Sequence, residues 1–104
     1  MKIVRQLLHK EGWHFGDAGL PIQVGVKFGA TPFGKNHLHK TMAEYFLLLE
    51  GGLRLQVNEK IVEMKRGDLI VVEAGEAHEV LHASPNALLF LLMPPPVAGD
   101  KVEL

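Results

Sequence analysis

The chain has 104 residues, a formal net charge of −1 at pH 7 and no cysteine. Such a length predicts a single domain, and the balanced charge argues against nucleic acid as the main partner, because binding to phosphates needs a basic surface. The lack of cysteine excludes disulfides and thiolate metal ligands.

Membrane and export signals are also missing from the sequence. The longest apolar runs, residues 45–49 and 87–93, are too short to span a bilayer. The beginning of the chain lacks a long apolar run before a small-residue cleavage site. We therefore expect a cytoplasmic protein with no membrane partner.

The first fifteen residues allow two interpretations. Ile3, Val4, Leu7 and Leu8 fit a helical stripe, whereas Ile3 and Val4 together with Trp13 also suit an extended arm. We expect residues 1–21 to form an N-terminal arm before a core at residues 22–93.

Short strands follow at regular spacing. Residues 22–28 and 53–57 alternate between apolar and other side chains, as half-buried strands do. Glycine, proline, asparagine and charged residues separate the further predicted strands, which are 44–49, 60–64, 68–72, 78–82 and 88–93. This pattern predicts an all-β sandwich or barrel without deciding between them. Prolines 94–96 end the last strand, and we expect the tail at 94–104 to be poorly ordered.

Three histidines and a glutamate stand out in this pattern. His37 and His39 are two residues apart, so a strand would point both imidazoles to one face. Glu44 follows after a short loop, and His78 lies on a later strand. Three nitrogens and one carboxylate suit a divalent transition metal, and iron, manganese, nickel, copper, cobalt or zinc would all fit. We expect about one ion per chain.

The spacing around these residues resembles the two motifs of the cupin family. The first, G-x5-H-x-H-x(3,4)-E-x6-G, is matched by His37, His39, Glu44 and Gly51, and the second, G-x5-P-x-G-x2-H-x3-N, by Gly67, Gly75 and His78. Three positions depart from the motifs, namely Thr31 for glycine, Glu73 for proline and His82 for asparagine. The resemblance implies a double-stranded β-helix (jelly-roll) barrel with His37, His39, Glu44 and His78 as metal ligands.

The expected small-molecule pocket contains Phe28, Met42, Phe46, His82 and Phe90. His82 lies four residues after His78, so on a regular strand both would face the interior, with His82 too far along to bind the same ion. His82 is thus the candidate catalytic residue. A hydrogen-bonding role behind the site, acid–base chemistry and core packing remain open for it.

The resemblance leaves the reaction open, because cupins include dioxygenases, decarboxylases, isomerases and metal-binding proteins of unknown role. Our first interpretation is a metal-dependent oxygenase acting on a small organic molecule. The alternatives are an isomerase or decarboxylase, and a non-catalytic module in which the metal anchors a ligand. Only three arginines occur, none on a predicted inward face, which disfavours a sugar-phosphate isomerase.

We also expect a symmetric homodimer. The strand pattern places several apolar side chains opposite the barrel lining, namely Leu47, Leu49, Leu89, Leu91 and Met93. A contiguous apolar surface usually marks an interface.

Overall fold

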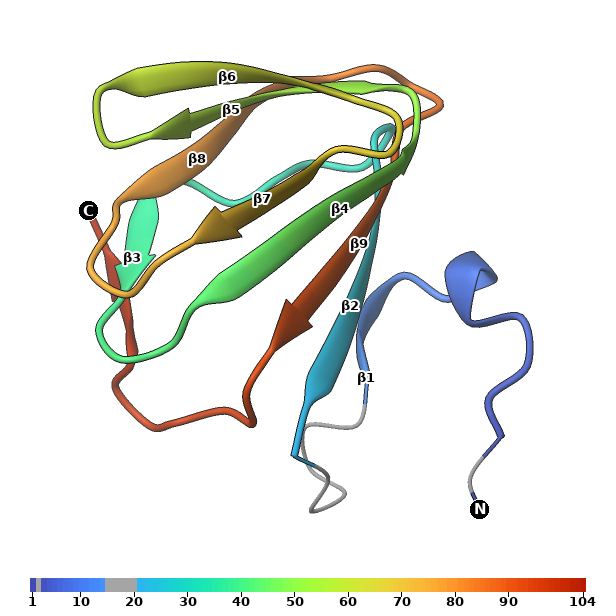
Figure 1. Cartoon of the computed structure of the whole chain (residues 1–104), viewed down its shortest axis with the longest axis horizontal. Coiled ribbons are helices and arrows are strands. Elements are labelled where there is room, and N and C mark those ends of the chain that lie inside the picture. The colour runs from blue at the N-terminus through green and yellow to red at the C-terminus, as the bar shows by residue number, and fades with distance from the viewer. Residues whose placement is uncertain (2, 15–20) are drawn as a thin grey trace.

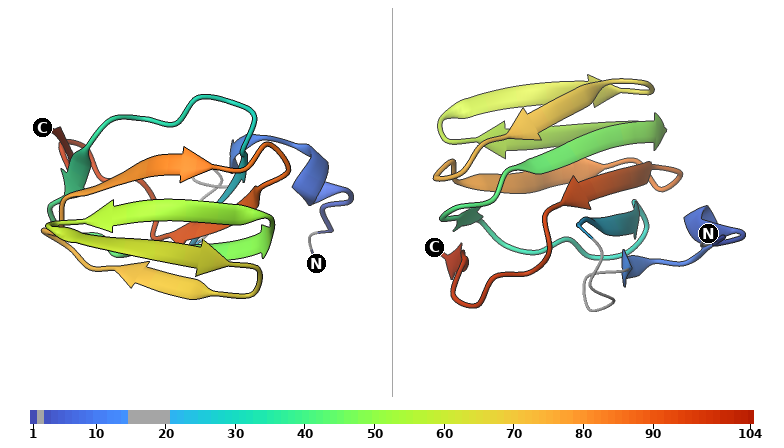
Figure 2. Two further views of the ribbon diagram at one scale, coloured as in Figure 1. Left: turned by 90° about the horizontal axis from the view of Figure 1, so that it is seen from above. Right: turned by 60° about the horizontal axis from the view of Figure 1, so that its bottom comes forward.

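Two five-stranded antiparallel sheets pack against each other in the computed structural model (Figures 1 and 2), which describes residues 1, 3–14 and 21–104. The first sheet has the order β1-β2-β9-β4-β7 and the second β10-β3-β8-β5-β6. The predicted all-β architecture is confirmed. No helix in the described part of the chain has the length and hydropathy of a membrane span.

The strands begin and end close to the predicted positions. The first sheet contains β1 (Gly12–His14), β2 (Gln23–Phe28), β4 (Glu44–Glu50), β7 (Leu69–Val72) and β9 (Leu88–Met93). The second contains β3 (His37–His39), β5 (Gly52–Val57), β6 (Lys60–Lys65), β8 (His78–Ala83) and β10 (Lys101–Glu103). A short 3-10 helix, η1 (Leu7–His9), precedes β1, so the arm is partly helical and partly extended.

The core lies between the two sheets. Its most buried side chains come from both of them and include Leu48, Leu53, Leu55, Met64 and Leu89. Strand β5 shows why the sequence folds this way, because Leu53 and Leu55 are buried while Arg54 between them is exposed. Period-2 alternation therefore sets which face of β5 packs inward.

In strands β2 and β9, the faces that point toward the interior are the opposite of those that we expected. Leu89, Leu91 and Met93 face the interior and are at most 9% exposed, so placing them on the outer surface was wrong. Their neighbours Leu88, Phe90 and Leu92 pair with the outward face of β2. Because every residue from Leu88 to Met93 is apolar, alternation gave no indication of which face is inside.

The tail is ordered, contrary to expectation. After the prolines end β9, the chain crosses to the other sheet, where β10 pairs antiparallel with β3. Asp100, directly before β10, is only 3% exposed. The prolines thus end one strand without preventing another, because the chain resumes pairing once past them.

Gly51 is the tight corner between β4 and β5. Its φ is +76°, and a Cβ there would lie 2.8 Å from the Cα of Ala87. We expect Gly51→Ala to lower the free energy of unfolding by about 2–4 kcal/mol, through both backbone strain and crowding. Gly67→Ala is the control, because Gly67 has φ +89° but open space around it, and should cost only about 1–2 kcal/mol. Urea unfolding of both variants measures the difference, and equal losses would rule out the crowding.

Candidate metal centre

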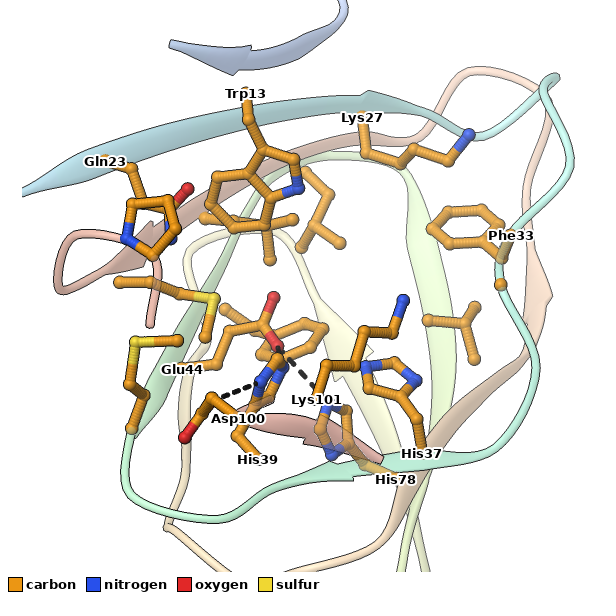
Figure 3. Close-up of a pocket in the computed structure, with 18 of the residues that line it drawn as sticks. Trp13, Gln23, Lys27, Phe33, His37, His39, Glu44, His78, Asp100 and Lys101 are labelled. Carbon is orange, nitrogen blue, oxygen red and sulfur yellow. Dashed lines mark hydrogen bonds and ion pairs between the residues drawn. The ribbon is translucent and has the colours of Figure 1, made fainter. Parts of the chain in front are cut away.

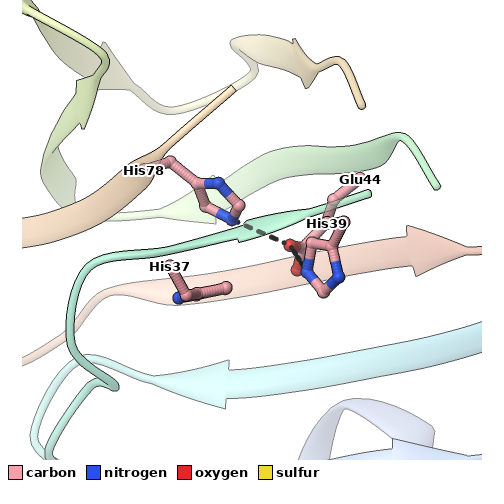
Figure 4. A group of neighbouring side chains, drawn as sticks. All are labelled: His37, His39, Glu44 and His78. Atoms are coloured by element: carbon pink, nitrogen blue, oxygen red, sulfur yellow. Dashed lines mark hydrogen bonds and ion pairs between the residues drawn. The ribbon is translucent and has the colours of Figure 1, made fainter. Parts of the chain in front are cut away.

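The four predicted donors meet at one end of the barrel, between the sheets (Figure 4). His37 and His39 lie on β3, His78 begins β8, and Glu44 begins β4 of the opposite sheet. One donor atom from each lies within 4.8 Å of the others. His39, Glu44 and His78 are buried, and His37 is half-buried.

Strand pairing positions these side chains. His37 pairs directly with His78 across β3 and β8, so the two imidazoles project from one face of the sheet. His39 projects to the same face two residues later. Gly75 donates its backbone N–H to the carbonyl of His39 at 2.7 Å, which ties the β7–β8 loop to this strand.

All three imidazoles have the same tautomer when neutral. The Nδ1 of His37 lies 2.8 Å from the carbonyl of Lys35, and the Nδ1 of His78 lies 3.0 Å from that of Glu76. The Nδ1 of His39 lies 2.9 Å from a carboxylate oxygen of Asp100. These oxygens only accept hydrogen bonds, so each Nδ1 carries a proton and each Nε2 keeps its lone pair.

The Nε2 atoms of two of these histidines lie next to a carboxylate. The Nε2 of His39 and of His78 lie 3.3 and 3.2 Å from the same Oε1 of Glu44. Lone pairs on both sides repel each other, so a cation is needed, either a proton on an imidazole or a metal ion. The donor set therefore fits a divalent transition metal, whose opposite ligands lie about 4.2 Å apart at bonds of roughly 2.1 Å.

The ionisation of the cluster in the metal-free protein follows from these contacts. Burial raises the pKa of Glu44, but its contacts with the imidazoles of His39 and His78 outweigh it and hold the pKa at about 2. The hydrogen bond to Glu44 raises the pKa of His39 against its burial, whereas burial lowers the pKa of His37. The cluster thus keeps its carboxylate charged and one imidazole, His37, readily neutral, as metal ligands need to be.

The donors form part of the wall of a cavity of about 390 Å³ (Figure 3). Its apolar lining includes Trp13, Phe33, Leu89, Leu91, Met93 and Val97. Met42 and Phe46, two predicted pocket residues, also line it. Figure 3 shows Trp13 and Lys27 on the side opposite the histidines.

The match to known proteins decides the family. The family model of the cupin domain matches residues 26–94. This chain is a cupin. No curated protein matches its sequence.

Solved structures agree with this assignment. A protein from Planctomyces limnophilus superposes with a TM-score of 0.75 at 17% identity, over 97% of this chain and 96% of that one. KdgF from a Halomonas species gives 0.67 at 17% identity, over 86% and 91% of the two chains. A predicted oxalate decarboxylase from Thermotoga maritima gives 0.58 at 18% identity, over 72% and 65%. At these identities the likeness shows the fold, a double-stranded β-helix.

Three predicted pocket residues of this cupin do not line the cavity, namely Phe28, His82 and Phe90. Phe28 and Phe90 lie on the outward face of the first sheet, in register with Leu88 and Val26. The apolar face of β2 thus points out, whereas its polar residues Gln23 and Lys27 point into the cavity.

His82 is exposed, so the prediction that it faces the interior is wrong. On β5, Leu55 pairs with Val80 of β8, and the adjacent Arg54 pairs with His82. Leu81 therefore has no partner on β5 and is the extra residue of a β-bulge. A bulge shifts the alternation by one, and His82 therefore joins the outward face with Arg54. Its position excludes a direct catalytic role at the metal cluster.

Several residues that line the cavity of this cupin were not predicted from the sequence. Gln23 and Lys27 could have been found, because they form the polar side of the alternating strand β2. Asp100 and Lys101 carried no such signal, since they follow the proline run in a short segment without periodicity. Trp13 enters the cavity because β1 pairs with β2 and sets it opposite Gly25.

Proposed function

We propose that this cupin is a metal-dependent oxygenase that acts on a small organic anion. The observation that carries the proposal is the placement of three imidazoles and a carboxylate in the wall of an otherwise largely apolar cavity. Its volume of about 390 Å³ falls within the range of small-molecule sites, roughly 300–1,000 Å³. Four protein donors leave two positions of a six-coordinate ion for other ligands. Held by these four side chains, an ion such as iron would supply the redox chemistry that activates dioxygen, and the organic substrate would provide the net electrons.

Two lysines favour an anionic substrate. Lys27 and Lys101 both line the cavity, and Figure 3 shows Lys101 beside the histidines. The ammonium of Lys101 lies 3.4 Å from Glu103, and that of Lys27 lies 2.6 Å from the hydroxyl of Thr31 and 3.7 Å from Glu11. A lysine attracts a carboxylate as a point charge, whereas phosphate recognition favours arginine. Among the described lining residues none is arginine, which supports a carboxylate over a phosphate ester.

The apolar wall would hold the body of such a substrate. Leu89, Leu91 and Met93 present one side of the cavity, and Trp13 stands across from the cluster at the mouth, 47% exposed. An apolar body there would displace water from the neighbourhood of the donors, and electrostatic interactions strengthen when water is excluded.

A decarboxylase is the second candidate, because the same two lysines would also bind a small dicarboxylate or keto acid. The predicted oxalate decarboxylase from Thermotoga maritima shares the fold. A decarboxylase would release carbon dioxide without net consumption of dioxygen, which separates it from the oxygenase.

The experiment is a substrate screen with the metal-loaded protein. Small aliphatic and aromatic carboxylates are incubated with dioxygen while an electrode records oxygen uptake and mass spectrometry records products. Oxygen uptake matched to product formation supports the oxygenase. Carbon dioxide release without oxygen uptake would instead show the decarboxylase, and saturable binding of unchanged ligand would show a non-catalytic module.

Two variants make the screen specific. His78→Ala removes a buried donor of the cluster, and His82→Ala removes an exposed imidazole from the same strand. The oxygenase proposal requires activity to be lost in the first and kept in the second.

We further propose that the protein is a homodimer formed through the outward face of the first sheet. This face is uncharged on four neighbouring strands, and its exposed or half-buried residues are Leu69, Val71, Tyr45, Leu47, Leu88, Phe90, Leu92 and Phe28. Leu69 is 56% exposed, and Tyr45 and Val71 are each 42% exposed. A second copy offers the same uncharged face in a symmetric contact.

Sedimentation at micromolar concentration tests the dimer. We expect a species of twice the 11.5 kDa chain mass. Leu69→Lys should weaken association by roughly tenfold or more, because it would bury an unpaired charge. Ile61→Lys is the matched control, since Ile61 on β6 is also 56% exposed but lies on the other sheet. A single 11.5 kDa species for the unaltered chain would disprove the dimer.

A further inference from the structure

The strand that carries two of the donors depends on the tail of the chain. β3 pairs with β8 through a single residue pair, His37 with His78. In contrast, β10 pairs with β3 along its whole length, from Lys101 opposite His39 to Glu103 opposite His37. Lys40 also donates its N–H to the carbonyl of Asp100 at 2.9 Å. The tail is therefore the main partner of the His37–His39 strand.

Asp100 lies at the start of this contact and is almost fully buried, at 3% exposure. One oxygen, Oδ2, accepts from the Nδ1 of His39 at 2.9 Å. The other, Oδ1, accepts from both the backbone N–H and the hydroxyl of Thr41, each at 2.7 Å. The two Thr41 contacts fix the carboxylate before any metal is present, so its orientation does not depend on His39.

From these contacts we infer that Asp100 is a positioning residue, which holds His39 in the tautomer whose Nε2 is free to bind a metal ion. A neutral ring has one N–H, and the Asp100 carboxylate at 2.9 Å from Nδ1 is closer than the Glu44 carboxylate at 3.3 Å from Nε2, so the proton belongs on Nδ1. The same bond orients the ring toward Glu44 and increases the basicity of the donor nitrogen. The inference rests on the proposed metal site, to which it adds a residue that contacts no ion itself.

Asp100→Asn tests this role, because an amide has one acceptor and one donor. If the amide nitrogen faces His39, Nδ1 has to accept and the proton moves to Nε2. If it faces Thr41, two donors oppose each other there. We expect the affinity for Zn²⁺ or Co²⁺, measured by competition with a chelator, to fall about 10–100-fold. The control Glu103→Gln makes the same chemical change at an exposed position on β10 and should leave affinity unchanged.

Nitrogen NMR of the histidines is measured on the unaltered chain, so it does not depend on whether the Asp100→Asn variant folds. In the metal-free chain, with the pH raised until the ring is neutral, His39 should carry its proton on Nδ1. A proton on Nε2 in the unaltered chain would overturn the inference, as would equal metal affinity of the Asp100→Asn and Glu103→Gln variants. Failure of the unaltered chain to bind either metal would refute the proposed function instead, and the NMR result would still decide the tautomer.

Discussion

The double variant His37→Ala/His39→Ala should lose its metal almost completely, from about one ion per chain to near none. It removes two of four donors that lie within 4.8 Å of one another, and two remaining donors hold a divalent ion weakly. Elemental analysis of protein purified without chelators measures the change.

The matched control for this loss is the variant His9→Ala/His82→Ala. It also removes two imidazoles, but both are exposed and neither belongs to the cluster. We expect its metal content to equal that of the unaltered protein. Equal metal in the two double variants would show that the ion, if present, binds elsewhere.

Glu44 should make the stability of the metal-free protein depend strongly on pH. Its pKa is about 2 in the folded state, against an ordinary value of 4.5, so the unfolded chain binds more protons between these values. The resulting stability, of the order of 3 kcal/mol, is fully present above about pH 4.5 and is lost as the pH falls toward 2. Urea unfolding of the metal-free protein at a series of pH values measures it.

His39 and His37 affect the stability of the folded chain at higher pH, and their effects have opposite signs. The raised pKa of His39 gives stability below about pH 6.5 that is lost as the pH rises, whereas the lowered pKa of His37 costs stability as the pH falls through the same range.

The steep loss of stability below pH 4.5 should disappear in Glu44→Gln and persist in the control Glu59→Gln, which changes an exposed carboxylate. An unchanged profile in Glu44→Gln would contradict the assigned cause.

The strands and the donor cluster were predictable because local rules govern them. The alternation in residues 53–57 predicted β5. The metal cluster was predicted, without knowledge of the sheet order, from the spacing of His37, His39, Glu44 and His78. Both patterns repeat on the period of a strand, so the sequence alone displays them.

The errors arose where one local irregularity or a distant contact decides the outcome. A single extra residue at Leu81 turned His82 outward, and no residue type announces such a bulge. The inward faces of β9 were hidden because its two sides are equally apolar. Asp100 reaches His39 only because β10 returns to pair with β3, which brings together residues 61 positions apart.

The central claim is that three imidazoles and one carboxylate bind a single divalent ion. X-ray absorption spectroscopy of the metal-loaded protein tests it most directly, because scattering from imidazole rings reports how many histidines bind. The structure predicts three imidazoles, from His37, His39 and His78, with the remaining ligands oxygen, at about 2.0–2.2 Å. Fewer than three imidazoles, or sulfur from the nearby Met42, would contradict it.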